Sequence, residues 1–217
     1  MNVEDLHQAI YEEILDGVIP AGKKVHIANL AKRYGVGLSR VREALSRLTA
    51  TELVIAKTQR GFVVAPLSRK DMEDIYVTRS YIEELALSLS IEKGDAHWEA
   101  EAAAAYYRLA QIEKKTTLDS MQSYKMWEKY HREFNVALIS ACGLQHLLDI
   151  QELIYRLTER YRRVWFRTGL KKNKSLLFSS KQKAILDAAL ARDAKKATGL
   201  LRDHFKRARE LISKAFS

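Results

Sequence analysis

One charged side chain lies where a helix should bury only apolar ones. In the segment that begins at Asp71, apolar residues recur at alternating steps of three and four, and Arg79 falls within that stripe. A buried guanidinium is unfavourable unless an acidic side chain or an anionic ligand neutralises it. The sequence leaves two explanations open: an internal ion pair with Glu83, Glu84 or a more distant acid, or the capture of an anion.

Three other predicted helices carry polar groups on faces that are otherwise apolar. His131 and Asn135 are four residues apart and share one helix face, while Gln182 and His204 each lie among aliphatic residues. For any single residue, a hydrogen-bonded core side chain is the simpler explanation. Several such groups that converge in a helical interior are what a small-molecule site requires. We therefore predict an effector site of Arg79, His131, Asn135, Gln182 and His204, in which Arg79, His131 and His204 bind a small carboxylate directly.

The stretch from residue 35 to residue 45 carries the side chains that a DNA-reading helix needs. Such a helix presents polar or basic groups at its N-terminal end and an apolar face behind them. Ser39, Arg40 and Arg42 supply the first, and Val41 begins the second. Arg can bond guanine bidentately or clamp a phosphate, and the sequence does not say which Arg does which. The predicted DNA contacts are Lys32, Arg33, Ser39, Arg40, Arg42, Arg47, Arg60 and Gly61, of which the last two belong to the tip of a wing.

Helices and one hairpin must position the DNA-reading side chains. Apolar periodicity predicts helices over residues 3–15, 27–33 and about 37–50. Two β-rich stretches, 53–56 and 61–65, follow and predict a hairpin. This order of elements is that of a winged helix-turn-helix, which we assign to residues 1–67.

The remainder of the chain is predicted to be all helix. Its helices are expected over residues 68–93, 96–114, 118–142, 145–168, 178–192 and 194–215, with a loop over 168–175. The fold class is therefore mainly α: a winged helix-turn-helix followed by a helical bundle over residues 68–217, which we expect to bind the effector and to form the dimer contact.

Charge changes sign along the chain. The net charge of +10 over 217 residues indicates a polyanionic partner. Residues 1–19 contain five acidic side chains and no Lys or Arg, whereas residues 20–60 contain nine basic and two acidic ones. The basic part coincides with the winged unit, which favours a double-stranded DNA operator as the partner.

Cysteine usage and hydropathy indicate the compartment. The single cysteine, Cys142, allows neither an internal disulfide nor a thiolate metal cluster, which fits a reducing environment. No apolar run is long enough to span a bilayer, and the first helix is acidic rather than a signal peptide. We expect a cytoplasmic protein with no membrane partner.

The N-terminal motifs resemble the GntR family of bacterial regulators. That family shows Leu-Ala, then a Val-Arg-Glu-Ala-Leu run, then a wing that ends in Arg-Gly-x-x-Val; here these are Leu30-Ala31, residues 41–45 and residues 60–64. The sequence departs from the family where Gly37 replaces Ser, Leu38 replaces Arg and Arg40 replaces Pro. One base-reading position of the family is therefore apolar here, and Arg40 is the candidate that compensates.

Residues 68–215 resemble the FCD domain, the helical ligand-binding domain of the FadR-like branch of that family. In many such domains an Asp and a His four residues apart, with two further His, bind a divalent metal. The resemblance implies that His131, Asn135, Gln182 and His204 occupy those four places. Neutral amides bind transition metals poorly, so a divalent metal held by His131 and His204 is the alternative to direct carboxylate capture.

The segment 154–168 has a basic face made of Arg156, Arg160, Arg163 and Arg167. We expect this face to be solvated. A dimer contact and an additional DNA contact are the alternatives.

Three functions account for these patterns to different extents. A repressor gated by a ligand, acting as a homodimer on a pseudo-palindromic operator, accounts for both the basic unit and the polar helix faces. A metal-assisted hydrolase built on His131 and His204 lacks a matching carboxylate pair, a Gly-rich phosphate loop and a nucleophile signature. A sequence-indifferent nucleic-acid protein lacks a stacking platform, since Phe62 is the single aromatic near the basic face. We expect a regulator and not an enzyme.

Overall fold

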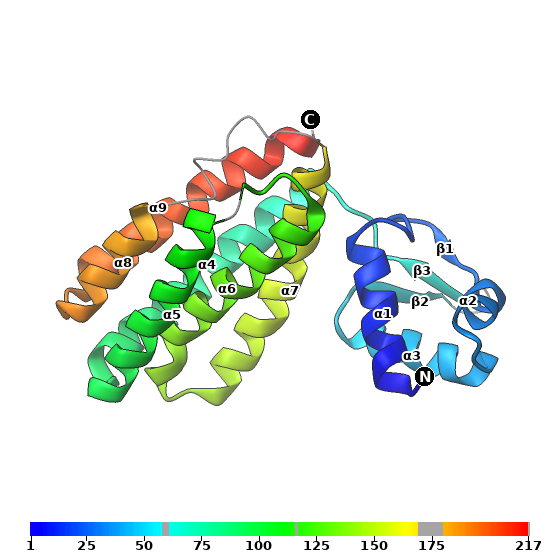
Figure 1. Ribbon diagram of the computed structural model, residues 1–217, viewed down its shortest axis with the longest axis horizontal. Coiled ribbons are helices and arrows are strands. Elements are labelled where there is room, and N and C mark those ends of the chain that lie inside the picture. Colours follow the sequence, from blue (N-terminus) through cyan, green and yellow to red (C-terminus); the bar gives the residue numbers. More distant parts are fainter. Residues whose placement is uncertain (58–60, 116, 169–179, 217) are drawn as a thin grey trace.

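The fold comprises a small α/β unit and a larger helical unit, shown at the right and left of Figure 1. The structure is a computed structural model, and it describes residues 1–57, 61–115, 117–168 and 180–216. Arg60 and nearly all of the predicted loop over residues 168–175 lie outside the described residues. The boundary between residues 67 and 68 stays a prediction.

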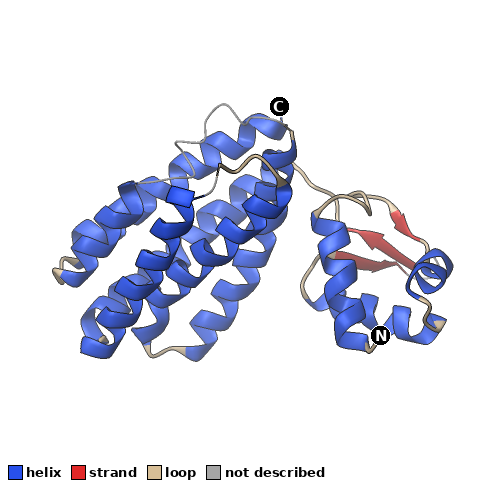
Figure 2. Ribbon diagram, in the orientation of Figure 1, coloured by secondary structure: helices blue, strands red, loops and turns tan. Residues whose placement is uncertain are grey.

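The N-terminal unit is the predicted winged helix-turn-helix. Its helices are α1 (Val3–Leu15), α2 (Ile27–Tyr34) and α3 (Leu38–Ala50), and its hairpin strands are β2 (Val54–Lys57) and β3 (Gly61–Val64). A strand that the sequence did not reveal, β1 (Lys24–Val25), pairs with β3, so the antiparallel sheet has the order β1-β3-β2 (Figure 2). Two residues are too few to show an alternating pattern, which is why β1 was missed.

The core of this unit lies between α1, α3 and the sheet. Leu6 and Ile10 of α1 meet Val41, Leu45 and Leu48 of α3, and all five side chains are fully buried. Their burial provides about 25 cal/mol of stabilisation for each Å² of apolar surface removed from water. Because the apolar face of α3 is used in this way, its opposite face is directed to solvent.

The helical unit contains the predicted helices with small shifts at their ends. They are α4 (Arg69–Lys93), α5 (Ala96–Lys115), α6 (Met121–Ile139), α7 (Gln145–Arg167), α8 (Ser180–Leu190) and α9 (Ala194–Ser213), with short 3-10 turns at Ser140–Cys142 and Lys214–Phe216. Helix α4 packs against α7 and α9, and α5 packs against α6 (Figure 1). None of the described helices is long and apolar enough to cross a bilayer.

Ser68 caps the start of α4. The Ser68 hydroxyl accepts a hydrogen bond from the Asp71 backbone N–H at 3.1 Å. The Asp71 carboxylate accepts a hydrogen bond from the Tyr161 hydroxyl of α7. This contact ties the start of α4 to α7, next to the link between the two units.

The prediction of a solvated basic face on α7 is wrong for two of its four arginines. Arg160 and Arg163 are 5% and 3% exposed. Arg160 Nη2 donates to the carbonyl oxygen of Ala65 at 2.6 Å, and Arg163 contacts α1. Periodicity places these residues on one face, but it cannot show that the N-terminal unit covers that face.

The turn between α2 and α3 gives a stability prediction with a matched control. Gly35 ends α2 with φ of 62°, whereas Gly37 precedes α3 with φ of −70°, and neither has a neighbour where a Cβ would stand. Gly35→Ser should lower the free energy of unfolding by roughly 1–2 kcal/mol, because an L side chain is strained in the left-handed region.

Gly37→Ser should leave that free energy unchanged or raise it slightly, since Ser is a good N-cap residue. Urea unfolding of both variants measures the difference. Equal losses would show that the left-handed turn is not the constraint at this site.

Candidate DNA interface and effector site

The outer face of α3 presents the predicted DNA-reading side chains. Ser39, Arg40 and Arg42 are exposed, and Val41 between them is fully buried. Leu38, at the position where the family carries Arg, is 51% exposed. The N-terminal end of α3 is therefore polar and basic on the side that faces away from its own core.

A groove of about 650 Å³ lies beside α3, between the start of α2 and the sheet. The His26 side chain makes no cap hydrogen bond at the start of α2, whereas the Asn29 N–H donates to the His26 carbonyl at 3.0 Å. The positive end of the helix dipole at this point favours an anion. The basic side chains around this groove are Lys24, Arg42 and Lys57. Lys24 and Lys57 were not among the predicted contacts, because only the pairing of β1 and β2 with β3 brings them together.

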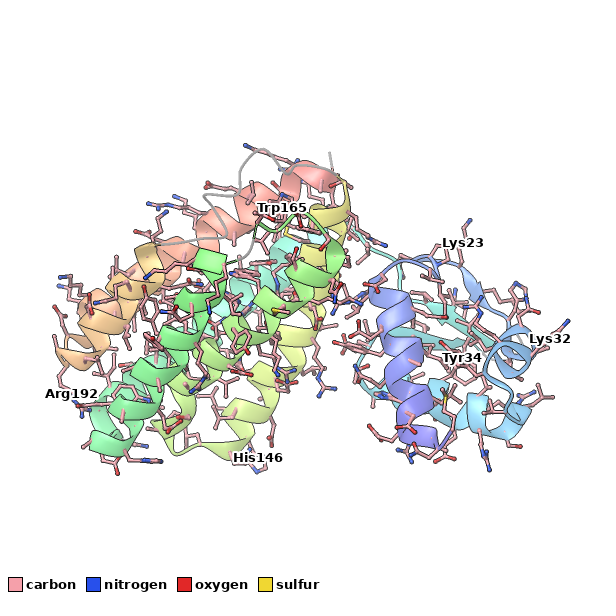
Figure 3. All side chains as sticks on the ribbon, viewed as in Figure 1. Lys23, Lys32, Tyr34, His146, Trp165 and Arg192 are labelled. Carbon is pink, nitrogen blue, oxygen red and sulfur yellow. The ribbon has the colours of Figure 1, made fainter. Side chains whose placement is uncertain are left out.

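Two of the predicted phosphate contacts are engaged by acids of the same domain. Arg33 donates to both oxygens of Glu13 at 2.7 Å, and Arg47 pairs with Glu4 at 3.1 Å and Glu43 at 2.8 Å. These pairs are exposed and therefore weak, so a DNA phosphate can compete for either Arg. Lys32 projects from α2 on the side away from the helical unit (Figure 3). Gly61 begins β3 with φ of 78°, and Arg60 is outside the described residues.

Arg79 is buried inside the helical unit, as its place in the apolar stripe predicts. It is 2% exposed, and its Nε donates to Glu83 Oε1 at 2.7 Å. Its Nη1 donates to the Thr158 hydroxyl at 3.0 Å, while its Nη2 has no hydrogen-bond partner in the described part of the chain. The internal ion pair with Glu83 therefore exists, and one donor group of the guanidinium remains available for a ligand.

A second buried arginine, which the sequence analysis did not select, lies beside Arg79. Arg162 of α7 donates from Nη1 to the same Thr158 hydroxyl at 2.8 Å. Both guanidiniums lie over the Tyr155 ring, at 4.8 Å for Arg79 and 4.6 Å for Arg162. We call Arg79, Arg162, Thr158, Tyr155 and Tyr76 the arginine cluster.

Several polar atoms of the arginine cluster are buried without a partner. Among the described residues, no hydrogen bond reaches the hydroxyls of Tyr76 and Tyr155 or the Nη2 atoms of Arg79 and Arg162. Buried polar groups are normally hydrogen-bonded, so this concentration of unpaired atoms needs a ligand or ordered water. Arg162 was missed because it falls in a segment where four other arginines suggested a solvated face.

The two predicted histidines lie near one another at the arginine cluster. The rings of His131 (α6) and His204 (α9) are 6.3 Å apart, and Asn135 Nδ2 lies 3.3 Å from His131 Nδ1. Burial and, after it, the positive charges of Arg79 and Arg162 lower the pKa of His204 to about 4 and hold that of His131 well below its usual value. Both imidazoles are therefore neutral at pH 7.

Gln182 of α8 is also buried, and both of its side-chain amide atoms are unpartnered in the described residues. No hydrogen bond or ring contact of the described residues joins Gln182 to His131 or His204. Its assignment to the effector site stays a prediction.

The polar groups do not form a metal site by themselves. Within the described ranges, no group of three or more His, Cys, Asp or Glu side chains is placed to bind one ion. His131 and His204 provide two imidazoles, and Asn135 provides a neutral amide, which falls short of the usual set for zinc. This donor set does not fit a tightly bound divalent metal.

A second set of charges, of which Arg163 and Glu159 are buried, joins the two units. Arg163 donates to Glu12 at 2.8 Å, to Asp16 at 2.9 Å and to Glu159 at 2.6 Å, and Lys125 also pairs with Glu12 at 2.7 Å. We call these five residues the interdomain cluster. The Tyr11 hydroxyl adds a hydrogen bond to Glu159 at 2.9 Å. Some of the acidic side chains in residues 1–19 therefore form ion pairs with the helical unit.

Glu128 of α6 lies between the arginine cluster and the interdomain cluster. It is 4% exposed, and burial together with the charge of Glu159 raises its pKa to about 7, although Arg162 and Arg163 oppose this rise. Glu128 was not among the predicted site residues, because the position of an acid in an amphipathic helix does not show that it is buried.

Comparison with known proteins agrees with this architecture. The family model for bacterial regulatory proteins of the gntR family matches residues 2–64, and the model for the FCD domain matches residues 74–207. The chain is 39% identical over 202 residues to the HTH-type transcriptional regulator BphR of Paraburkholderia xenovorans, covering 93% of this chain and 81% of that protein. It is 32% identical over 201 residues to the HTH-type transcriptional repressor GlaR of Escherichia coli, covering 92% and 90%.

The solved structure of E. coli McbR/YncC superimposes with a TM-score of 0.78 at 17% identity, over 99% of this chain and 98% of that one. At this identity the likeness concerns the fold. It agrees with the arrangement of a winged unit followed by a helical unit.

Arg42 should be the most sensitive DNA contact of α3, because it is exposed at the groove and has no ion-pair partner among the described residues. Arg42→Ala should weaken binding to a duplex selected by the wild-type protein from a random library by at least about tenfold, since a good base contact contributes roughly 1–3 kcal/mol. Fluorescence anisotropy over a range of salt measures the effect.

Arg207→Ala is the control, because Arg207 is exposed on α9 in the helical unit. Its affinity should match that of the wild type. Equal affinities for Arg42→Ala and the wild type would exclude the docking of α3 proposed below.

The lowered pKa of His204 predicts how stability depends on pH. The folded-state pKa of about 4 lies below the usual value of 6.5, so the neutral ring adds stability above pH 6.5 that is lost as pH falls through 4. The free energy of unfolding of the wild type should therefore fall between pH 6.5 and 4 by up to about 3 kcal/mol more than that of His204→Gln.

Urea unfolding at several pH values measures this difference. His146→Gln removes a fully exposed ring and should retain the wild-type slope. Parallel curves for the wild type and His204→Gln would contradict a lowered pKa of His204 in the folded protein.

Proposed function

The chain belongs to the GntR family of bacterial regulatory proteins and carries its FCD domain, and on that premise we propose that a small carboxylate in the helical unit controls how tightly this transcription regulator holds its operator. The observation that supports the effector most strongly is the arginine cluster. Two buried guanidiniums there share one hydroxyl. The Nη2 of Arg79 has no hydrogen-bond partner in the described residues, and the Nη2 of Arg162 has only an ion pair with Glu128.

Arg79 and Arg162 are the residues that attract the carboxylate. The sequence predicts that Arg79, His131 and His204 bind the carboxylate together, but the lowered pKa values of the two histidines leave both rings neutral at pH 7. The positive charge must therefore come from the arginines, which bind carboxylates through strong charge-assisted hydrogen bonds. The histidines and the hydroxyls of Tyr76 and Tyr155 then orient the ligand through neutral hydrogen bonds.

The DNA side of the function uses the face of α3 and the groove beside it. Arg42 and Ser39 enter the major groove, while Lys24, Lys57 and the start of α2 hold phosphates. The protein acts as a homodimeric repressor on a pseudo-palindromic operator, in agreement with the repressor name of its relative GlaR. Carboxylate and DNA change each other's affinity, because each favours one arrangement of the two units.

A screen of small carboxylates and divalent metals by thermal shift tests this function. A ligand that binds the folded state raises the melting temperature, by an amount that grows with ligand concentration above Kd. We expect one or more small carboxylates to raise it and metals alone not to. Stabilisation by metals with no response to any carboxylate would overturn the proposal in favour of a metal-dependent regulator.

Paired variants test the role of Arg79, and the double variant removes both charges of the buried Arg79–Glu83 pair. Glu83 also accepts a hydrogen bond from Gln151, so Glu83→Gln keeps a hydrogen-bonding side chain while removing the anion that competes with the ligand. Glu83→Gln should bind the carboxylate more tightly than the wild type. Arg79→Gln combined with Glu83→Gln should bind it roughly ten- to a hundredfold more weakly than Glu83→Gln alone, because a charged hydrogen bond contributes about 1.5–3 kcal/mol.

Isothermal calorimetry with the carboxylate from the screen measures both affinities. DNA affinity without effector should be the same in the two variants. If the double variant binds the carboxylate as tightly as Glu83→Gln, Arg79 has a structural role only.

A further inference from the structure

One carboxylate is shared by two consecutive arginines of α7. Glu128 Oε1 accepts a hydrogen bond from Arg162 Nε at 3.2 Å, and Glu128 Oε2 accepts one from Arg163 Nε at 3.2 Å. Arg162 Nη2 also lies 3.2 Å from Oε1, without hydrogen-bond geometry. Glu128 is thus divided between two cations, one at each oxygen.

The two arginines lead to different parts of the protein. Successive residues of an α-helix point about 100° apart, so neighbours on α7 face different surroundings. Arg162 faces the arginine cluster, where it shares Thr158 with Arg79. Arg163 faces α1 of the DNA-binding domain, where it holds Glu12 and Asp16. Glu128 is the contact that both have in common.

We propose that Glu128 is the positioning residue that transmits occupancy of the effector site to the DNA-binding domain. An anion that binds Arg162 competes with Glu128 for that guanidinium. Glu128 then has Arg163 as its remaining arginine partner and draws it away from Glu12 and Asp16. The hold of α7 on the C-terminal end of α1 weakens, and the DNA-binding domain is freed to change its orientation.

Burial makes this exchange effective. Glu128, Arg162 and Arg163 are 4%, 6% and 3% exposed, so water cannot readily replace a lost partner. In a medium of low dielectric constant, each charge responds strongly to the gain or loss of a neighbour. The inference rests on the proposed function only for the identity of the anion. The contacts of Glu128 with Arg162 and Arg163 are present in the ligand-free protein.

Hydrogen exchange of the full-length protein, without any ligand, tests the linkage. Arg162→Gln removes the guanidinium from Glu128 and mimics its capture by an anion. Amide exchange in peptides that cover residues 10–17, at the C-terminal end of α1, should become severalfold faster. In a Glu128→Gln background, the same substitution should leave the exchange of that segment unchanged.

Two further variants make the result decisive. Arg202→Gln removes an arginine that pairs with Glu84 on α4, and it should not alter exchange in α1. The Asp side chain is too short to contact both arginines, so Glu128→Asp is the background to use if the Glu128→Gln protein does not fold. If Arg162→Gln has no effect on α1, or has the same effect with and without Glu128, the linkage through Glu128 is wrong.

The carboxylate identified by the screen provides a second readout. It should speed exchange in residues 10–17 of the wild type, and it should bind the Glu128→Gln variant without changing that exchange. An equal change in both proteins would overturn the proposal. Absence of binding to the wild type would contradict the proposed function instead, and the ligand-free comparison would still decide the role of Glu128.

Discussion

The structure depends on hydrogen-bond acceptors for buried guanidiniums. Arg79, Arg160, Arg162 and Arg163 are each at most 6% exposed, and none can stay charged in the interior without nearby acceptors. Glu83 serves Arg79, the Ala65 carbonyl serves Arg160, and Glu128 serves the other two. These acceptors come from α4, the interdomain link and α6, so the requirement ties the helices to one another and to the DNA-binding domain.

The same requirement explains the charge asymmetry of the N-terminal domain. Its acidic first helix is not a surface that repels DNA, because Glu12 and Asp16 face Arg163, while Glu4 and Glu13 face arginines of α3 and α2. The exposed face of α3 and the neighbouring groove remain basic. Acids therefore position the domain, and the bases that they leave free are those suited to phosphate and base contacts.

Much of the fold was predictable from the sequence, because periodicity and caps act locally. The helices from α1 to α9 and the wing follow from apolar spacing, and the burial of Arg79 follows from its place in an apolar stripe. The roles of Arg162, Arg163 and Glu128 did not follow, because they depend on contacts between segments far apart in the chain. Periodicity assigns a residue to a face, but only tertiary packing decides whether solvent or another domain covers it.

The central claim is that anion binding in the helical unit and DNA binding by α3 are thermodynamically linked. The most direct test is to measure the Kd of the wild-type protein for its selected duplex with and without saturating carboxylate, and the Kd for the carboxylate with and without that duplex. The account predicts that both constants change by the same factor, different from one, as thermodynamic linkage requires. A factor of one in both directions would show that the two sites are independent and would contradict the account.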